Sequence, residues 1–163
     1  MRKGERMRHW LVFFLIPVLS LSCIKSLKEP VNSVVFALKD GRKINVGCNT
    51  SECMIMVAGR IILREMYYGK PSEFLTQRHP LPSDIFIVTL HPGDSCPALY
   101  RVLDMRGNKP NLTEAFGNCD TIRDIQFDRK REILSVSFDK SYAPHRPSRF
   151  VYNTKKLILN SLY

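Results

Sequence analysis

Five cysteines are the residues of this sequence whose chemistry is most readily predicted. In an oxidising compartment thiols pair as disulfides, and small exported domains use such bonds to stabilise a limited core. Four cysteines allow three pairings, and the simplest assignment joins neighbours along the chain. We therefore predict two disulfides, Cys48–Cys53 and Cys96–Cys119, which leave Cys23 unpaired.

Histidines and one serine are the other candidates for chemistry. Zinc sites need cysteine or histidine ligands at short, regular spacings. The chain has no Cys-x-x-Cys pair, and after His9 its remaining histidines, His79, His91 and His145, are scattered. We therefore predict no metal and no cofactor. Gly93-Asp94-Ser95 resembles the turn of some serine hydrolases, but a nucleophilic serine also needs a base and an orienting carboxylate. A plain β-turn explains the same three residues, because turns favour Asp, Gly and Ser.

An export signal precedes the folded part of the chain. Four basic residues among the first eight are followed by an apolar run, Trp10 to Leu19, and by small residues before Cys23. This order is typical of a signal peptide, and the run is shorter than the roughly 20 residues of a membrane span. We expect removal of residues 1–22, which leaves 21 basic and 14 acidic residues and a net charge of +7.

The residues around Cys23 favour a lipid anchor. Leu19 to Cys23 resembles the lipobox of bacterial lipoproteins, although Ser20 stands where an aliphatic residue is usual. Acylation of Cys23 would also leave an even number of cysteines for disulfides. Residues 23–31 would then be the anchor and a leash that reaches at most roughly 28 Å, and residues 32–163 a single domain that faces the periplasm. The alternative is ordinary cleavage and a soluble exported protein with one odd thiol.

Short apolar stretches between turn residues indicate an all-β domain. We expect about nine strands in an antiparallel sandwich or meander. The clearest signal is the alternation of apolar and polar residues in Ile122–Phe127 and Ile133–Phe138, on either side of a charged turn. Asp40-Gly41 predicts another hairpin, whereas Ile61–Tyr67 fits either a strand or a short helix. Gly69–Ser83 contains three prolines and is predicted to be a long surface loop.

Two segments form a motif pair, Cys96-Pro97-Ala98-Leu99-Tyr100-Arg101-Val102 and Ala115-Phe116-Gly117-Asn118-Cys119. The pair resembles one in small, poorly characterised exported β-domain lipoproteins of Gram-negative bacteria. The resemblance implies a disulfide that joins the start of a strand to the following turn, then a hairpin and a final strand that contains tyrosine. Phe127–Phe138 and Phe150–Leu157 fit that continuation. What the resemblance implies is an architecture and not an activity.

Basic residues are concentrated in the last third of the chain. A positive surface attracts acidic partners over long range, and arginine and tyrosine often dominate protein interfaces. The alternative is a solvated set of charges that protects strand edges from aggregation. The predicted partner-binding residues are Arg129, Lys130, Arg131, Tyr142, Arg146 and Arg149.

These observations together predict a non-enzymatic envelope lipoprotein that binds another macromolecule. We expect an acidic protein partner, either a toxin that this chain neutralises as an immunity protein or a component of an envelope machine. The membrane is expected to be contacted through the N-terminal lipid, and no nucleic-acid partner is expected outside the cell. The alternative is a small-ligand-binding or hydrolytic periplasmic domain that uses Gly69–Ser83 and His79 or His91.

Overall fold

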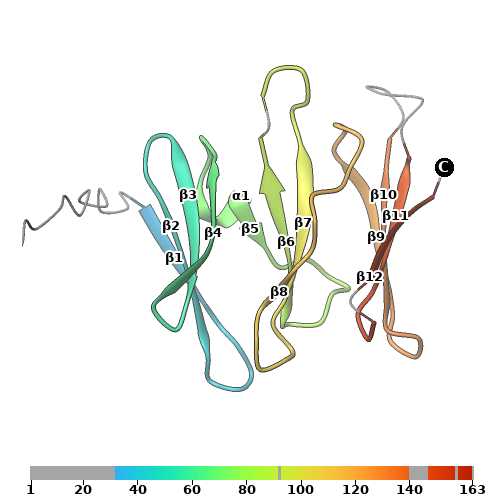
Figure 1. Ribbon diagram of the computed structural model, residues 1–163, viewed down its shortest axis with the longest axis horizontal. Helices are drawn as coiled ribbons and strands as arrows, with labels where there is room; N and C mark the ends of the chain where they lie inside the picture. Colours follow the sequence, from blue (N-terminus) through green and yellow to red (C-terminus); the bar gives the residue numbers. More distant parts are fainter. Residues whose placement is uncertain (1–31, 92, 140–146, 157, 163) are drawn as a thin grey trace, which may run out of the picture.

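The protein forms three antiparallel β-sheets of four strands each (Figure 1). The structure is a computed structural model, and it describes residues 32–91, 93–139, 147–156 and 158–162. This part of the chain contains twelve strands and one short helix. The predicted all-β class is therefore confirmed.

Each sheet is built from one continuous stretch of the chain. The first sheet contains β1 (Asn32–Ala37), β2 (Lys43–Cys48), β3 (Glu52–Val57) and β4 (Arg60–Met66). The middle sheet follows the helix α1 (Pro71–Phe74) and contains β5 (Leu75–Thr76), β6 (Ile85–Leu90), β7 (Leu99–Asp104) and β8 (Asn111–Leu112). The third sheet contains β9 (Ile122–Asp128), β10 (Ile133–Phe138), β11 (Arg149–Asn153) and β12 (Ile158–Leu162). Because strands pair in sequence order, each sheet is a simple antiparallel meander.

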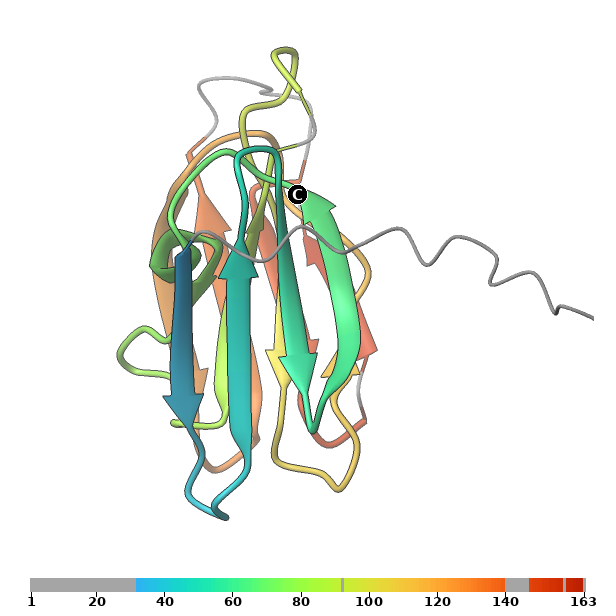
Figure 2. The same ribbon diagram turned by 90° about the vertical axis from the view of Figure 1, so that its left-hand side faces the viewer.

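The three sheets stack face to face, so that the middle sheet is covered on both sides (Figures 1 and 2). Strand β6 shows the consequence. Phe86 and Val88 belong to the apolar cluster shared with the first sheet, whereas Ile85 and Ile87 belong to the cluster shared with the third. All four side chains are at most 2% exposed. The uninterrupted apolar run of β6 is thus the sequence of a strand that is buried on both faces.

The structure corrects several details of the predicted strand pattern. There are twelve strands rather than about nine, partly because β5 and β8 contain two residues each and are too short to produce a periodic signal. Ile61–Tyr67 is mostly strand β4 and not a helix. Gly69–Ser83 is not a continuous loop, since α1 and β5 lie within it. Tyr152 lies in β11, which is the last strand but one, so the expected final strand that contains tyrosine is followed by β12, which begins at Ile158.

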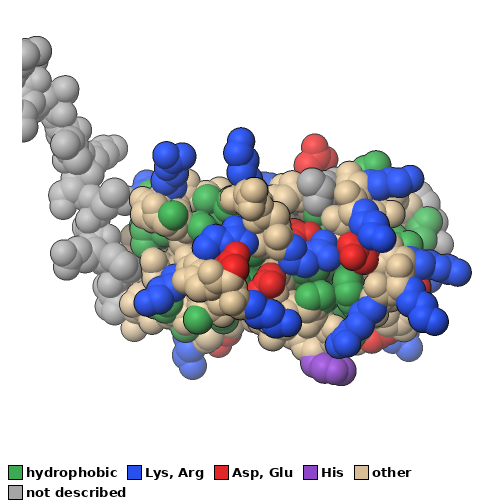
Figure 3. Space-filling view, turned by 90° about the horizontal axis from the view of Figure 1, so that it is seen from below, with side chains coloured by type: hydrophobic (Ala, Val, Ile, Leu, Met, Phe, Trp, Pro, Cys, Tyr) green, Lys and Arg blue, Asp and Glu red, His purple; other side chains and the backbone are tan. Residues whose placement is uncertain are grey.

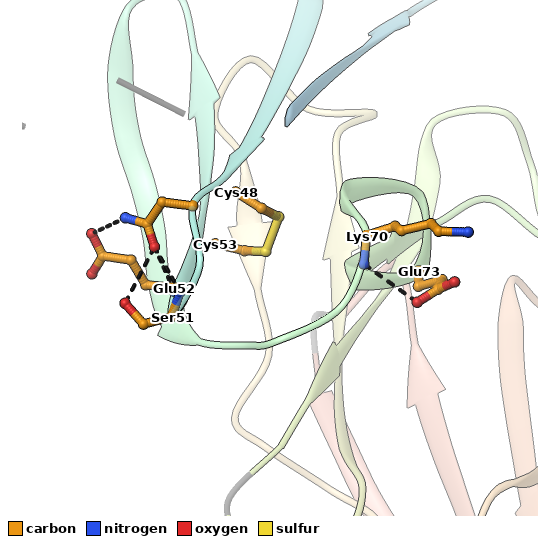
Figure 4. The surroundings of a disulfide bond; sticks show 7 residues. Cys48, Ser51, Glu52, Cys53, Lys70 and Glu73 are labelled. Carbon is orange, nitrogen blue, oxygen red and sulfur yellow. Dashed lines mark hydrogen bonds between the residues drawn. A yellow bond between two sulfur atoms is a disulfide. The ribbon is translucent and has the colours of Figure 1, made fainter. Parts of the chain in front are cut away.

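Both predicted disulfides are present. Cys48–Cys53 closes the turn between β2 and β3, and the two residues are also direct partners in the strand register (Figure 4). Cys96–Cys119 joins the connection after β6 to the connection before β9. The connections that these bonds join lie at the upper end of the stack in Figure 1, which we call the disulfide end. Cys23 lies outside the described residues.

The strand register determines where the chain enters the domain. Asn32, the first residue of β1, pairs with Cys48 at the end of β2. The described chain therefore begins at the disulfide end, and β1 runs from there to the opposite end (Figure 1). A strand of six residues spans about 20 Å, so the two ends are separated by about this distance.

Candidate functional site

Basic residues gather at the end of the stack opposite the disulfides. Four of the six connections at this end, 38–42, 105–110, 128–132 and 153–156, contain nine Lys and Arg residues but only three Asp and Glu, and the other two, 58–59 and 77–84, add only Arg78 and Asp84. We call these four connections the basic end. Figure 3 looks onto it and shows Lys and Arg side chains spread over the surface, with Asp and Glu among them. The nine basic residues are Lys39, Arg42, Arg106, Lys109, Arg129, Lys130, Arg131, Lys155 and Lys156.

The carboxylates of the basic end already have basic partners. Asp40 Oδ2 lies 2.5 Å from Arg42 Nε. The backbone N–H of Arg42 also donates to Asp40, and it is the first cause that holds the pKa of this carboxyl below its usual value. Glu132 Oε2 lies 3.4 Å from the Arg106 guanidinium. Six basic side chains of this end make no ion pair with any residue that the structure describes: Lys39, Lys109, Arg129, Lys130, Lys155 and Lys156.

Two turns of the third sheet hold their charged residues by the same local hydrogen bonds. Asp128 Oδ1 accepts the backbone N–H groups of Lys130 and Arg131 at 2.9 and 3.1 Å. Asn153 Oδ1 accepts the N–H groups of the two lysines in its own turn at 3.1 and 3.0 Å. Asp and Asn favour such turns because their side chains can bond the backbone two residues ahead. The charged side chains therefore project from turns with a defined backbone.

Two arginines connect the turns of neighbouring sheets. Arg42, in the first sheet's turn, donates from its guanidinium to the Gly107 carbonyl oxygen at 2.9 Å, in the middle sheet's turn. Arg106 pairs with the buried Asp104 at 2.8 Å, and its guanidinium also donates to the Thr154 carbonyl oxygen of the third sheet at 3.4 Å. The hydrogen bond with Asp104 is the main reason why the pKa of Arg106 is raised. The basic end is thus one surface that is braced across all three sheets.

Three of the predicted partner-binding residues belong to this surface, since Arg129, Lys130 and Arg131 form the turn between β9 and β10. Arg149 does not, because it begins β11 and pairs with Ser137 far from that turn. Its guanidinium donates to Ser135 Oγ at 3.1 Å. Tyr142 and Arg146 lie outside the described residues.

Sequence reasoning missed the contribution of the first and middle sheets to the basic end. Lys39 and Arg42 are separated from Arg129 by most of the domain, and no local pattern links them. Only the stacking of the sheets brings these turns to the same end. The sequence contains one signal for these residues, which is that basic residues recur in the turns that it predicts. The missed residues are Lys39, Arg42, Arg106 and Lys109.

The residues considered for hydrolysis do not form a catalytic arrangement. The His91 ring stacks on Tyr67 with centroids 4.7 Å apart. Its Nδ1 donates to the Pro97 carbonyl oxygen at 2.5 Å. Ser95 is exposed in the intervening turn, and no hydrogen bond joins it to His91 in the described structure. Packing therefore accounts for His91. No group of three or more metal-binding side chains occurs among the described residues.

A cavity of about 480 Å³ lies beside His91. It has space for a small ligand, but neither His79 nor Ser95 lines it. Its lining includes hydroxyl groups, one carboxylate and one guanidinium, which are common groups and do not specify a ligand. The lining residues that carry polar side chains are Tyr67, Ser72, Glu73, Thr76, Arg78, Thr89, His91, Tyr100 and Thr121.

Comparison with protein-family models, with curated proteins and with solved structures finds no match for this chain. Among the described residues, no helix has both the length and the apolar character needed to cross a membrane. The distribution of charge over the fold is therefore the observation on which a function is best proposed.

Tyr152 provides a test of the packing beneath the basic end. Its side chain is 1% exposed, and its hydroxyl accepts a hydrogen bond from Asn111 Nδ2 at 2.7 Å. Burial raises the pKa of Tyr152 to about 12. Because the folded state favours the protonated phenol, this contribution to stability is complete below pH 10 and is lost as the pH rises towards 12.

We expect Tyr152→Phe to destabilise the protein by about 1 kcal/mol at pH 7, through loss of the hydrogen bond. Between pH 10 and pH 12 the variant should lose less stability than the parent chain. Urea unfolding at several pH values measures both effects. Tyr68→Phe, at a side chain that is 72% exposed, is the matched control. Parallel pH profiles for Tyr152→Phe and the parent chain would contradict this account.

Proposed function

We propose that this chain is a lipid-anchored, non-enzymatic envelope protein whose basic end binds an acidic surface of a protein partner. The segregation of charge is the observation that supports the proposal. Nine basic residues occupy the four connections of the basic end. At the disulfide end, the described connections 49–51, 67–70, 93–98 and 113–121 contain three acidic residues and one lysine. A molecule with this distribution presents one defined surface to an anionic partner.

The entry point of the chain supports a partner away from the anchoring membrane. The described chain begins at the disulfide end, immediately after residues 24–31, which are predicted to be a leash. If Cys23 carries lipid, the short leash favours an orientation with the disulfide end nearest the membrane. The basic end then faces away, about 20 Å further out. A partner in the periplasm, either a delivered toxin or a component of an envelope machine, would meet the basic end first.

The chemistry of the unpaired side chains supports electrostatic capture. Five of the six basic side chains without ion pairs are lysines, whose ammonium groups are mobile and strongly hydrated. Such charges contribute chiefly by steering an oppositely charged partner, and their effect falls as salt screens it. We therefore expect association to be fast and to depend strongly on ionic strength.

Charge reversal at the basic end tests the proposal. We expect Arg129→Glu with Lys130→Glu to reduce partner capture at least tenfold at physiological salt, because four units of charge change within the contact surface. A photo-crosslinking amino acid at position 109 measures how much partner is captured. The measurement is made in the cells in which the protein naturally occurs. The yield for the parent chain should fall as the salt concentration rises.

The matched control is Arg64→Glu with Lys70→Glu, which changes the net charge equally at two exposed positions outside the basic end. The control should retain at least half of the crosslinking yield. Equal losses in both double variants would show that net charge alone matters. Equal yields in the parent chain and the Arg129→Glu, Lys130→Glu variant would refute a role for the basic end.

A further inference from the structure

Strand β1 is an open sheet edge that lacks the usual protection. Exposed edge strands can pair with other chains, and proteins commonly guard them with charges, prolines or very short strands. None of the six residues of β1 is charged or proline. The edge strands β4 and β9 each carry three or more charged residues, and β5 and β8 have only two residues each. Strand β1 is therefore the longest unguarded edge in the described structure.

The hydrogen-bond pattern shows which backbone groups of β1 face the open edge. The Leu38 N–H donates to the Arg42 carbonyl oxygen at 2.9 Å, directly beyond the paired residues of β1 and β2. Antiparallel pairs alternate between bonded and non-bonded positions, so Phe36 and Val34 bond to β2. The N–H and C=O groups of the residues between them then point outward. Val35 lies at the centre of this edge, and its side chain is 55% exposed.

A groove of about 650 Å³ lies beside the same edge. Its walls come from β1, α1, the middle sheet and the connection between β5 and β6. Leu75 and Phe86 line its base and are at most 2% exposed. Phe36 of β1 contacts Phe86 edge to face, with ring centroids 5.4 Å apart. Arg78 is the one charged residue in its lining, and it makes no ion pair within the described structure.

Strand β12 is the other uncharged edge strand of more than two residues, and the depressions beside it have different walls. Strand β12 contains Ile, Leu, Asn and Ser. Two depressions reach its residue Leu162, and their walls consist of the third sheet and the connection before β11. A strand added to β1 would instead place its alternate side chains in the groove between β1 and the middle sheet.

We propose that β1 binds an extended segment of a protein partner as an added antiparallel strand. Main-chain hydrogen bonds to the open edge provide affinity in this mode of recognition, and pockets for alternate side chains provide specificity. Alternate apolar side chains of the segment lie along the groove beside Val34 and Phe36, which are half-buried. A carboxylate near the N-terminus of the segment pairs with Arg78, which lies near the end of β1 where an antiparallel segment begins. Arg78 lies in connection 77–84, at the same end of the stack as the basic end, but the site uses none of the nine residues of that surface and does not depend on its function.

A synthetic peptide provides the first test. The probe is an acetylated, amidated heptapeptide, Asp-Val-Thr-Val-Thr-Val-Thr, titrated into the mature full chain and followed by amide exchange and by binding affinity. We expect the amides of Ser33, Val35 and Ala37 to become protected. Val35→Pro removes one outward N–H while leaving the bonds to β2 intact, and it should weaken binding at least tenfold. Val35→Thr retains the N–H and should bind within threefold of the parent chain.

Arg78→Glu tests the charged contact. We expect this variant to bind the probe at least fivefold more weakly, and a peptide with lysine in place of aspartate should restore most of the loss. Unchanged affinity in Val35→Pro would overturn the proposal, as would absence of protection at the three amides. Protection of these amides in the free protein would also overturn it. The edge would then be occupied by residues 24–31 or, if the protection depends on protein concentration, by a second copy of the chain.

Discussion

Replacing Cys23 with serine is expected to move nearly all of the protein from the membrane fraction to the soluble fraction of the envelope. Each buried methylene of a lipid chain contributes about 0.8 kcal/mol to membrane binding, and two or more chains give stable anchoring. Serine offers no thiol for the thioether bond to lipid. The measurement is fractionation of a Gram-negative host combined with the intact mass of the mature protein.

The mass of the parent protein distinguishes the alternatives. A chain that begins at Cys23 and carries a diacylglyceryl group and an acyl chain would support the lipid anchor. Ser22→Ala keeps a small residue before the cleavage site and should leave the protein in the membrane fraction. An unmodified parent chain that begins near Cys23 and is soluble would disprove the anchor, and it would leave one odd thiol free for pairing between molecules.

Removal of the Cys96–Cys119 disulfide is expected to destabilise the domain more than removal of Cys48–Cys53. A crosslink reduces the entropy of the unfolded chain, and the reduction grows with the length of the loop that it closes. The two cysteines are 23 residues apart, against 5 for Cys48 and Cys53. The loop-entropy relation gives about 3.5 kcal/mol for the long loop and about 2 kcal/mol for the short one.

Urea unfolding of two double variants measures the difference. Cys96→Ala with Cys119→Ala should lose more free energy of unfolding than Cys48→Ala with Cys53→Ala, and neither variant leaves an odd cysteine in the domain. The parent protein unfolded with reductant should be less stable than either variant. Equal losses in the two variants would mean that local packing, and not loop length, dominates the contribution of these bonds.

The strands that were easiest to predict are those with one face in solvent. In β9, Ile125 and Phe127 pack against the core, while Asp124 and Gln126 do not, so the sequence alternates. Strand β6 lacks this alternation because sheets cover both of its faces. Its apolar run predicted a strand, but it did not predict that the domain has three stacked sheets. The two-residue strands β5 and β8 had no periodic signal, since their pairing depends on neighbours that lie elsewhere in the sequence.

The basic end could be predicted only in part for a related reason. Arg129, Lys130 and Arg131 are consecutive, so the sequence alone places them together. Lys39 and Lys109 lie in the turns of other sheets, and their position depends on the direction of each strand and on the stacking. Arg149 is near the predicted cluster in sequence, but its strand begins at the other end of the sheet. The open edge of β1 was also invisible, because a hairpin pattern does not show which strand lies outermost.

The order of the cysteines has a consequence for how the chain matures. Each disulfide joins two cysteines that follow one another along the domain, and each sheet is formed from one continuous segment. If the chain is exported with its N-terminus first, Cys48 and Cys53 emerge before Cys96 does. Oxidation in order of emergence then produces the native pairs directly, without later exchange between thiols and disulfides. The first and middle sheets can pack together while the last is still being translocated, and this packing covers the apolar face of the first sheet before the chain is complete.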